Sequence, residues 1–140
     1  MTDSLLATFR VGDLLLGLPV DAVEEVVDVE QVTPVPLAPR EVSGLINLRG
    51  RILAAVDVRE SFGLPPRPEG ASRVHVVLGV TGEATSLVVD EMRDVVLVAD
   101  DEREDVPETL APALRRLVTG AYQQQSALLL LLDPELVLAL

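Results

Sequence analysis

The side chains that could catalyse a reaction are few in this sequence and stand in unpromising places. The one histidine, His75, lies inside the apolar run Val74-His75-Val76-Val77, which favours a structural or partly exposed role over a catalytic one. The paired carboxylates Glu24-Glu25 and Asp100-Asp101 lie in acidic surroundings without a cationic or metal-binding partner. We therefore expect both pairs to form solvated faces rather than an acid and base pair.

Motifs that bind phosphate or metal are also missing from the sequence. Gly44 and Gly50 are not followed by the Lys and Ser of a phosphate-binding loop. The acidic run 100–105 could hold Ca²⁺, but it lacks the central glycine and the spacing of an EF-hand loop. The absence of cysteine excludes thiol catalysis and thiolate metal sites. The sequence thus predicts no enzyme, no cofactor and no metal; the alternative is an enzyme that uses a metal at the acidic run.

Composition limits the possible partners. The net charge of -12 argues against a nucleic-acid partner and against anionic membranes, because both require clustered basic side chains. The longest apolar run, 127–132, is far too short to span a bilayer, and the N-terminus lacks the pattern of a signal peptide. We expect one cytoplasmic domain, 1–140, with no nucleic-acid partner and no direct membrane insertion.

The elements that must position any site are short strands. They recur every 8 to 12 residues, and no helical pattern exceeds about two turns, which is typical of small β-barrels or a sandwich. The run 63–70, rich in proline and glycine, is the clearest linker. Outside the central stretch 43–57, strands are expected at 5–11, 14–20, 24–29, 31–35, 73–80, 85–89, 92–98, 117–122 and 126–132, with short helical turns at 21–23, 59–62 and after Asp133.

The stretch 43–57 forms the centre of the chain. It reads as two strands separated by a corner, Asn47-Leu48-Arg49-Gly50. Gly50 can adopt a backbone conformation closed to other residues, and Arg49 carries a fixed charge on a planar five-donor fork. Such a corner either holds the structure together or serves as a docking point.

Two further sets of residues invite a choice between structure and function. Asp21, Asp57 and Asp90 each follow a strand run, and we expect each to cap the next turn. The valines between positions 23 and 29 are more apolar than one buried face requires. They indicate either a strand buried on both sides or an exposed groove for a partner.

The chain also resembles itself. Residues 18–29 match 87–98 at an offset of 69, with six of twelve positions identical. The central stretch is echoed at an offset of 76, where Asp57 meets Asp133. Two similar halves, about 1–70 and 71–140, are therefore predicted. The halves differ at the corner. Asn47-Leu48-Arg49-Gly50 is aligned with Gln123-Gln124-Gln125-Ser126, which carries no charge, and this favours a specific role for Arg49.

Several of these segments resemble the CheW family of chemotaxis coupling proteins. The most specific block is Gly44-Leu45-Ile46-Asn47-Leu48-Arg49-Gly50, followed by Asp57-Val58-Arg59, whose Asp57 is eight residues after Arg49. The opening Phe9-Arg10-Val11-Gly12-Asp13 and the later Leu87-Val88-Val89-Asp90-Glu91-Met92 also match, so the resemblance covers nearly the whole chain.

The resemblance implies a mainly β fold of two intertwined five-stranded SH3-like β-barrels that share a hydrophobic core, with short helical turns. The two halves are expected to exchange strands within a single domain. It also implies a non-enzymatic scaffold that joins the cytoplasmic tip of a chemoreceptor to the regulatory domain of a CheA-type histidine kinase.

Receptor-binding residues are implied by the same resemblance. Asn47, Leu48 and Arg49 would lie at or near the receptor-binding region, and Val23, Val26 and Val27 would line a groove that receives the receptor tip. Gly44 and Gly50 would serve backbone geometry.

Two departures from the family pattern indicate a divergent member. Leu16 stands where an aromatic residue is usual, and Ala54 or Ala55 where a proline is usual. The alternative is therefore a CheW-like adaptor for a non-flagellar kinase pathway, controlling surface motility or transcription, without a transmembrane receptor.

Overall fold

The computed structural model describes residues 3–29, 31–80, 83–125 and 127–139, and its strands form two five-stranded sheets. The helices among these residues are single turns of three to five residues. In chain order the elements are β1 (Asp3–Val11), β2 (Leu14–Pro19), η1 (Val20–Ala22), β3 (Val23–Val27), β4 (Val42–Leu48), β5 (Arg51–Asp57), α1 (Val58–Ser61), β6 (Val74–Val80), β7 (Glu83–Val89), β8 (Glu91–Ala99), η2 (Asp100–Glu102), α2 (Pro112–Arg115), β9 (Val118–Gln124), β10 (Ala127–Leu132) and α3 (Pro134–Leu138).

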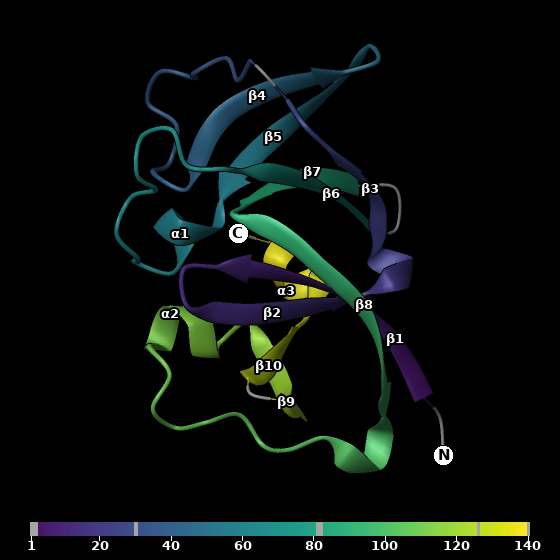
Figure 1. Ribbon diagram of the computed structural model, residues 1–140. Helices are drawn as coiled ribbons and strands as arrows, with labels where there is room; N and C mark the ends of the chain where they lie inside the picture. The colour runs from purple at the N-terminus through teal and green to yellow at the C-terminus, as the bar shows by residue number, and fades with distance from the viewer. Residues whose placement is uncertain (1–2, 30, 81–82, 126, 140) are drawn as a thin grey trace.

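Each sheet takes strands from both halves of the chain. One sheet has the order β8-β1-β2-β10-β9, and the other has the order β3-β6-β7-β5-β4. Neighbouring strands are antiparallel except for β2 with β10 and β5 with β7, which are parallel. We call the first sheet barrel A and the second barrel B. In Figure 1 barrel B lies above barrel A, and the long strand β8 of barrel A runs diagonally across the front of the molecule.

The two barrels have the same strand order once the two sequence offsets are applied. An offset of 69 places β1, β2 and β3 on β6, β7 and β8, and an offset of 76 places β4 and β5 on β9 and β10. The first sheet order then becomes the second, strand by strand. The parallel registers also agree, because Leu131 opposite Gly17 in barrel A is the counterpart of Ala55 opposite Ser86 in barrel B.

A single large apolar cluster joins the barrels. It contains Phe9, Leu16 and Leu18 of barrel A together with Val76 and Leu87 of barrel B, all essentially inaccessible to solvent. Since the few aromatic residues cannot fill this volume, the branched side chains of alternating strands do so. The prediction of a mainly β fold with two intertwined barrels and a shared core is confirmed.

The predicted strand 31–35 and the predicted cap at Asp21 are wrong. The segment 31–35 forms only a bridge, in which Thr33 exchanges two backbone hydrogen bonds with Leu45, because the prolines around it cannot donate to a ladder. The turn after β2 begins at Val20 and carries no side-chain cap from Asp21. The cap predicted at Asp57 is present, since its carboxylate accepts a hydrogen bond from the Arg59 backbone N–H at 3.0 Å.

Candidate functional site

The corner between β4 and β5 is a two-residue turn. Both central residues have positive φ, 53° at Arg49 and 85° at Gly50. The side-chain oxygen of Asn47 accepts a hydrogen bond from the Gly50 N–H at 2.9 Å and supports the turn from within. Glycine adopts this conformation freely, whereas an arginine there carries a cost of roughly 1–2 kcal/mol. Positive φ at both central residues is usual in a two-residue hairpin turn, so the conformation follows from the turn type, and the uncommon feature is an arginine at the first of these positions.

Two arginines of the corner pair with two glutamates of β3. Arg49 donates through Nη2 to the carboxylate of Glu25, and Arg51 bonds Glu24 through Nη1 at 3.2 Å. The expectation that the pair Glu24-Glu25 has no cationic partner is therefore wrong. The residues that neutralise it lie more than twenty positions along the chain, and only the fold brings them together.

These ion pairs orient side chains more than they stabilise the fold. The Arg49 side chain is 72% exposed, so water and salt screen its attraction to Glu25, and such a pair contributes at most about 1 kcal/mol. A guanidinium held in place but still exposed can exchange its partner for a carboxylate of another molecule. The corner is thus a preoriented cationic point on the surface.

The residues predicted to bind a receptor divide between surface and interior. Asn47 and Arg49 are exposed, while Leu48 is half-buried and packs against the small core cluster around Ile46. On β3, Val26 is 42% exposed, but Val23 and Val27 pack against the two core clusters.

Neighbouring apolar side chains add to this surface. Leu45 and Ile52 are exposed on the outer face of the β4–β5 hairpin, where Asn47 pairs with Ile52 in register. We call the exposed set Val26, Leu45, Asn47, Arg49 and Ile52 the corner surface. Leu45 and Ile52 were missed in the sequence because both faces of the hairpin are apolar, so that no alternation marked the outer one.

The two predicted turn glycines serve different geometries. Gly50 is in open space and provides the positive φ of the corner. Gly44 lies within β4 at a φ of 152°, and a Cβ there would overlap the carbonyl oxygen of Thr33. Gly44 therefore allows the segment 31–34 to approach the sheet closely.

A buried carboxylate fastens the barrels to the linker. Asp90, 3% exposed, lies between β7 and β8 and accepts hydrogen bonds from Arg59 at 2.6 and 3.0 Å, from Arg67 at 2.9 Å and from the Gly12 N–H at 2.7 Å. Arg67 also bonds Asp57 at 3.3 Å. Asp90 therefore does not act as the turn cap that the sequence suggested. The sequence offered two signals for this cluster. Arg59 and Arg67 lie beside or within the linker 63–70, and Asp90 stands at the end of a strand run.

Electrostatics keep this carboxylate ionised. Burial alone would raise the pKa of Asp90, but the hydrogen bonds from Arg59, Gly12 and Arg67 outweigh it and hold that pKa far below its usual range. The same hydrogen bond to Asp90 raises the pKa of Arg59. The cluster is a permanent set of charges that holds three segments together.

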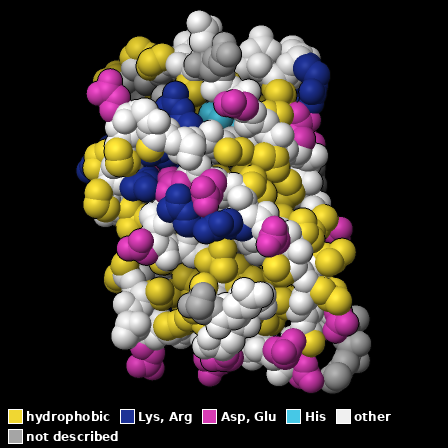
Figure 2. All heavy atoms as spheres, viewed as in Figure 1, with side chains coloured by type: hydrophobic (Ala, Val, Ile, Leu, Met, Phe, Trp, Pro, Cys, Tyr) yellow, Lys and Arg dark blue, Asp and Glu magenta, His cyan; other side chains and the backbone are white. Residues whose placement is uncertain are grey.

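A second exposed apolar group lies on barrel A. Leu5, Val95 and Leu97 are 52%, 59% and 62% exposed, and Leu5 stands directly opposite Leu97 in the β1–β8 ladder. We call these three residues the β8 patch. Figure 2, viewed from the side on which β8 crosses in Figure 1, shows hydrophobic side chains exposed on this face. Adjacent exposed apolar residues of this kind often mark a partner surface.

Within the described residues, no group of three or more His, Asp or Glu side chains could hold a metal ion. No helix there is long and apolar enough to cross a membrane. The described residues form a double barrel with two exposed sets of apolar side chains, in the corner surface and in the β8 patch.

Comparison with known proteins assigns the family. The CheW-like domain model matches residues 6–140, so the chain belongs to the CheW-like family of chemotaxis adaptor proteins. The chemotaxis protein CheW of Rhizobium meliloti is 30% identical over 128 residues, which cover 91% of this chain and 83% of that protein. The CheW of Treponema pallidum is 26% identical over 132 residues, covering 91% of this chain and 78% of that protein.

A sequence relative that matches a shorter part of the chain is protein FrzA of Myxococcus xanthus. It is 36% identical over 89 residues, covering 64% of this chain and 53% of that protein.

A solved structure agrees with the fold. The scaffolding protein TtCheW from Thermoanaerobacter tengcongensis superposes with a TM-score of 0.83 at 25% identity, covering 94% of this chain and 90% of that one.

Proposed function

We propose that the chain is a non-enzymatic scaffold that binds a chemoreceptor tip and the regulatory domain of a CheA-type histidine kinase at the same time. The single observation that carries the proposal is the exposed, preoriented Arg49 at the corner of a hairpin that also exposes Leu45 and Ile52. Family membership supplies the kind of partner. The protein would work in the cytoplasm, recruited to receptor arrays.

The corner surface suits a helical receptor tip. Val26, Leu45 and Ile52 offer apolar contacts of the sort that hold an amphipathic helix in a groove. Arg49 would exchange its bond with Glu25 for a carboxylate or carbonyl of the receptor, giving orientation to a contact whose affinity is mainly apolar. Asn47 would support this by keeping the turn closed. Val23 and Val27 would act from beneath, as packing for the exposed Val26.

The β8 patch is the proposed kinase surface. It belongs to barrel A, while the corner surface belongs to barrel B, so that one partner need not displace the other. Val95 and Leu97 lie on the edge strand β8 and Leu5 lies on the neighbouring β1, so a β-rich partner can approach the patch from the sheet edge. A scaffold needs two such separate surfaces, and occupancy of both would couple receptor state to kinase state.

Two variants on the purified full chain test this assignment. Arg49→Ala should weaken binding of a receptor-tip peptide about tenfold and leave kinase binding unchanged, because it removes one charge-assisted hydrogen bond at the corner. Val95→Glu should do the reverse, since it places a charge in the apolar patch. Gln125→Ala, at the matching corner of barrel A, is the control and should change neither affinity.

Calorimetric titration of each variant with the receptor-tip peptide and with the kinase regulatory domain gives the readout. Equal loss of both affinities in either variant would contradict separate surfaces. Binding of the kinase domain with no binding of any receptor tip would favour an adaptor in a kinase pathway without a transmembrane receptor.

A further inference from the structure

The two barrels differ in how the hairpin corner meets the neighbouring edge strand. In barrel B, Arg49 of the corner bonds Glu25 of β3. The matching residues of barrel A are Gln125, at an offset of 76, and Asp94, at an offset of 69. Both line a cavity of about 490 Å³, so the place that an arginine bridges in barrel B is open in barrel A.

A register shift sets the two carboxylates in the same way. In barrel B the ladder of β3 with β6 shifts between Val23 and Glu25. In barrel A the ladder of β8 with β1 shifts at the matching place, between Met92 and Val95. Because a bulge of this kind redirects the side chains beside it, Asp94 stands in the backbone setting from which Glu25 reaches its arginine.

The carboxylate of Asp94 is available to a partner. The residue is exposed, and within the described part of the chain its carboxylate makes no hydrogen bond or ion pair. The Thr8 hydroxyl donates to the backbone carbonyl of Asp94 and leaves the carboxylate unoccupied. Asp13, which also lines the cavity, is likewise exposed.

The charges around the cavity favour a cation as occupant. Two guanidiniums line the wall, those of Arg10 and Arg93, but both bond one carboxylate, that of Glu91, at 3.2 and 3.3 Å. Asp13, Asp94 and Glu91 outnumber the two guanidiniums, so the region is negative overall. Carboxylates bind guanidinium groups through strong, oriented hydrogen bonds, as barrel B itself illustrates.

On the basis of the proposed kinase contact at the β8 patch, we infer that Asp94 accepts an arginine side chain of the kinase regulatory domain. That arginine takes the place that Arg49 of the same chain takes at Glu25. Asp94 adjoins Val95 of the β8 patch, and β8 is an edge strand, so a partner at this edge can reach both residues. Asp94 then determines specificity, because it favours a kinase with a basic residue at this point and opposes one with an acidic residue.

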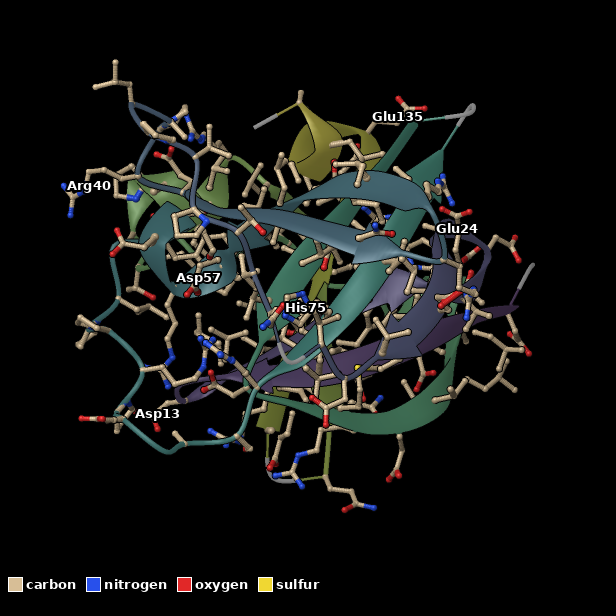
Figure 3. All side chains as sticks on the ribbon, turned by 90° about the horizontal axis from the view of Figure 1, so that it is seen from above. Asp13, Glu24, Arg40, Asp57, His75 and Glu135 are labelled. Atoms are coloured by element: carbon tan, nitrogen blue, oxygen red, sulfur yellow. The ribbon has the colours of Figure 1, made fainter. Side chains whose placement is uncertain are left out.

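The two corners lie on opposite sides of the molecule. Figure 3 labels Asp13, on the cavity wall of barrel A, and Glu24, which Arg51 bonds beside the corner of barrel B. The two labelled side chains stand at opposite sides of that view. An arginine bound at Asp94 therefore leaves Arg49 free for the receptor tip.

Two substitutions in the purified full chain test the inference by calorimetric titration with the kinase regulatory domain. Asp94→Asn removes the charge, keeps the shape and should weaken kinase binding about five- to tenfold. Gln125→Arg should weaken it by a similar factor, because the new guanidinium would occupy Asp94 within the chain, as Arg49 occupies Glu25. Neither substitution should change the affinity for the receptor-tip peptide.

A matched control separates this contact from general electrostatics. Asp105→Asn removes the same charge from an exposed position outside the cavity wall and should leave kinase affinity within about twofold. Raising the sodium chloride concentration should reduce the difference between the wild-type chain and Asp94→Asn.

The outcomes distinguish this contact from the scaffold function itself. Kinase affinity that is unchanged in Asp94→Asn or in Gln125→Arg, or equal weakening in Asp94→Asn and Asp105→Asn, would overturn the inference and leave the scaffold function standing. Failure of the wild-type chain to bind the kinase regulatory domain would overturn both.

Discussion

The two hairpin corners of this molecule share a positive φ at their first central residue and differ in chemistry. Arg49 and Gln125 occupy matching positions at an offset of 76, and both have positive φ, 53° and 43°. In barrel B the corner arginines pair with Glu25 and Glu24 of β3. The residues of β8 that match these glutamates at an offset of 69 are Asp94 and Arg93.

In barrel A that matching place is open. Gln124, Gln125 and Ala127 line a cavity of about 490 Å³ together with Arg93 and Asp94. Ser126, which matches Gly50 in the predicted twin corner, lies outside the described residues. The positive φ of the first central residue is common to both barrels, while a few side chains decide which corner is charged. Specificity can thus be introduced into one barrel without altering the architecture.

Between the two halves, we expect the largest difference in the cost of a substitution to the free energy of unfolding at Asp90 and its counterpart Asp21, 69 residues earlier. Asp90→Ala should lower the free energy of unfolding by about 3–5 kcal/mol, because it leaves Arg59 and Arg67 buried without their carboxylate. Asp21→Ala, at an exposed position, should change it by less than about 0.5 kcal/mol. Urea unfolding of both variants measures the difference, and similar values would show that the buried cluster is not a clamp.

Gly44 and its counterpart Gly120 should tolerate a methyl group unequally. Gly44→Ala would press Cβ against the carbonyl of Thr33 at a φ of 152°, and we expect a loss of about 2–3 kcal/mol. At Gly120 the nearest atoms belong to the side chain of Arg103, which can move aside, so the loss should be about 1 kcal/mol or less. Thermal or urea unfolding decides between them. Equal losses would indicate that the segment 31–34 shifts as easily as a side chain.

His75 and its counterpart Leu6 differ in whether they make the stability of the fold depend on pH. Both are buried, but His75 must stay neutral because burial and Arg73 lower its pKa in the folded state. Its contribution to stability is therefore present above the unfolded pKa of about 6.5 and is lost as pH falls toward the folded pKa, with a slope of at most about 1.4 kcal/mol per pH unit. His75→Leu should remove this slope above pH 5.5, as measured by unfolding between about pH 5.5 and 8. A slope that survives the substitution would have to come from other groups.

Local patterns were enough to predict the architecture. Short alternating strands indicated barrels, and the offsets of 69 and 76 relate the strands of the two sheets as the structure has them. Asp57 and Asp133 both accept a hydrogen bond from the backbone N–H two residues on, as a local cap requires. These features depend on neighbours in sequence, which a single sequence displays.

Features that depend on distant neighbours were not predictable. Asp21, Asp57 and Asp90 look alike in the sequence, yet Asp90 is the one that is buried and bonded by two arginines, because α1 and the linker return to the end of β7. Glu25 gains its cation only when the β4–β5 hairpin is placed beside β3. The β8 patch was hidden because both faces of 92–98 are rich in valine and leucine, and the buried face could not be told from the exposed one.

We expect the smallest change in stability when the charged residue of the barrel B corner is introduced into the corner of barrel A. Gln125→Arg would place a guanidinium on a backbone that already has the required φ, near Asp94, the counterpart of Glu25. Since the new pair would be largely exposed, we expect stability to rise by no more than about 0.5 kcal/mol. A double-mutant cycle with Asp94→Ala measures the coupling, and raising the salt concentration should weaken it. Coupling indistinguishable from zero at low salt would mean that the two corners differ in geometry as well as in side chains, and that the charged corner of barrel B depends on its exact fit to β3.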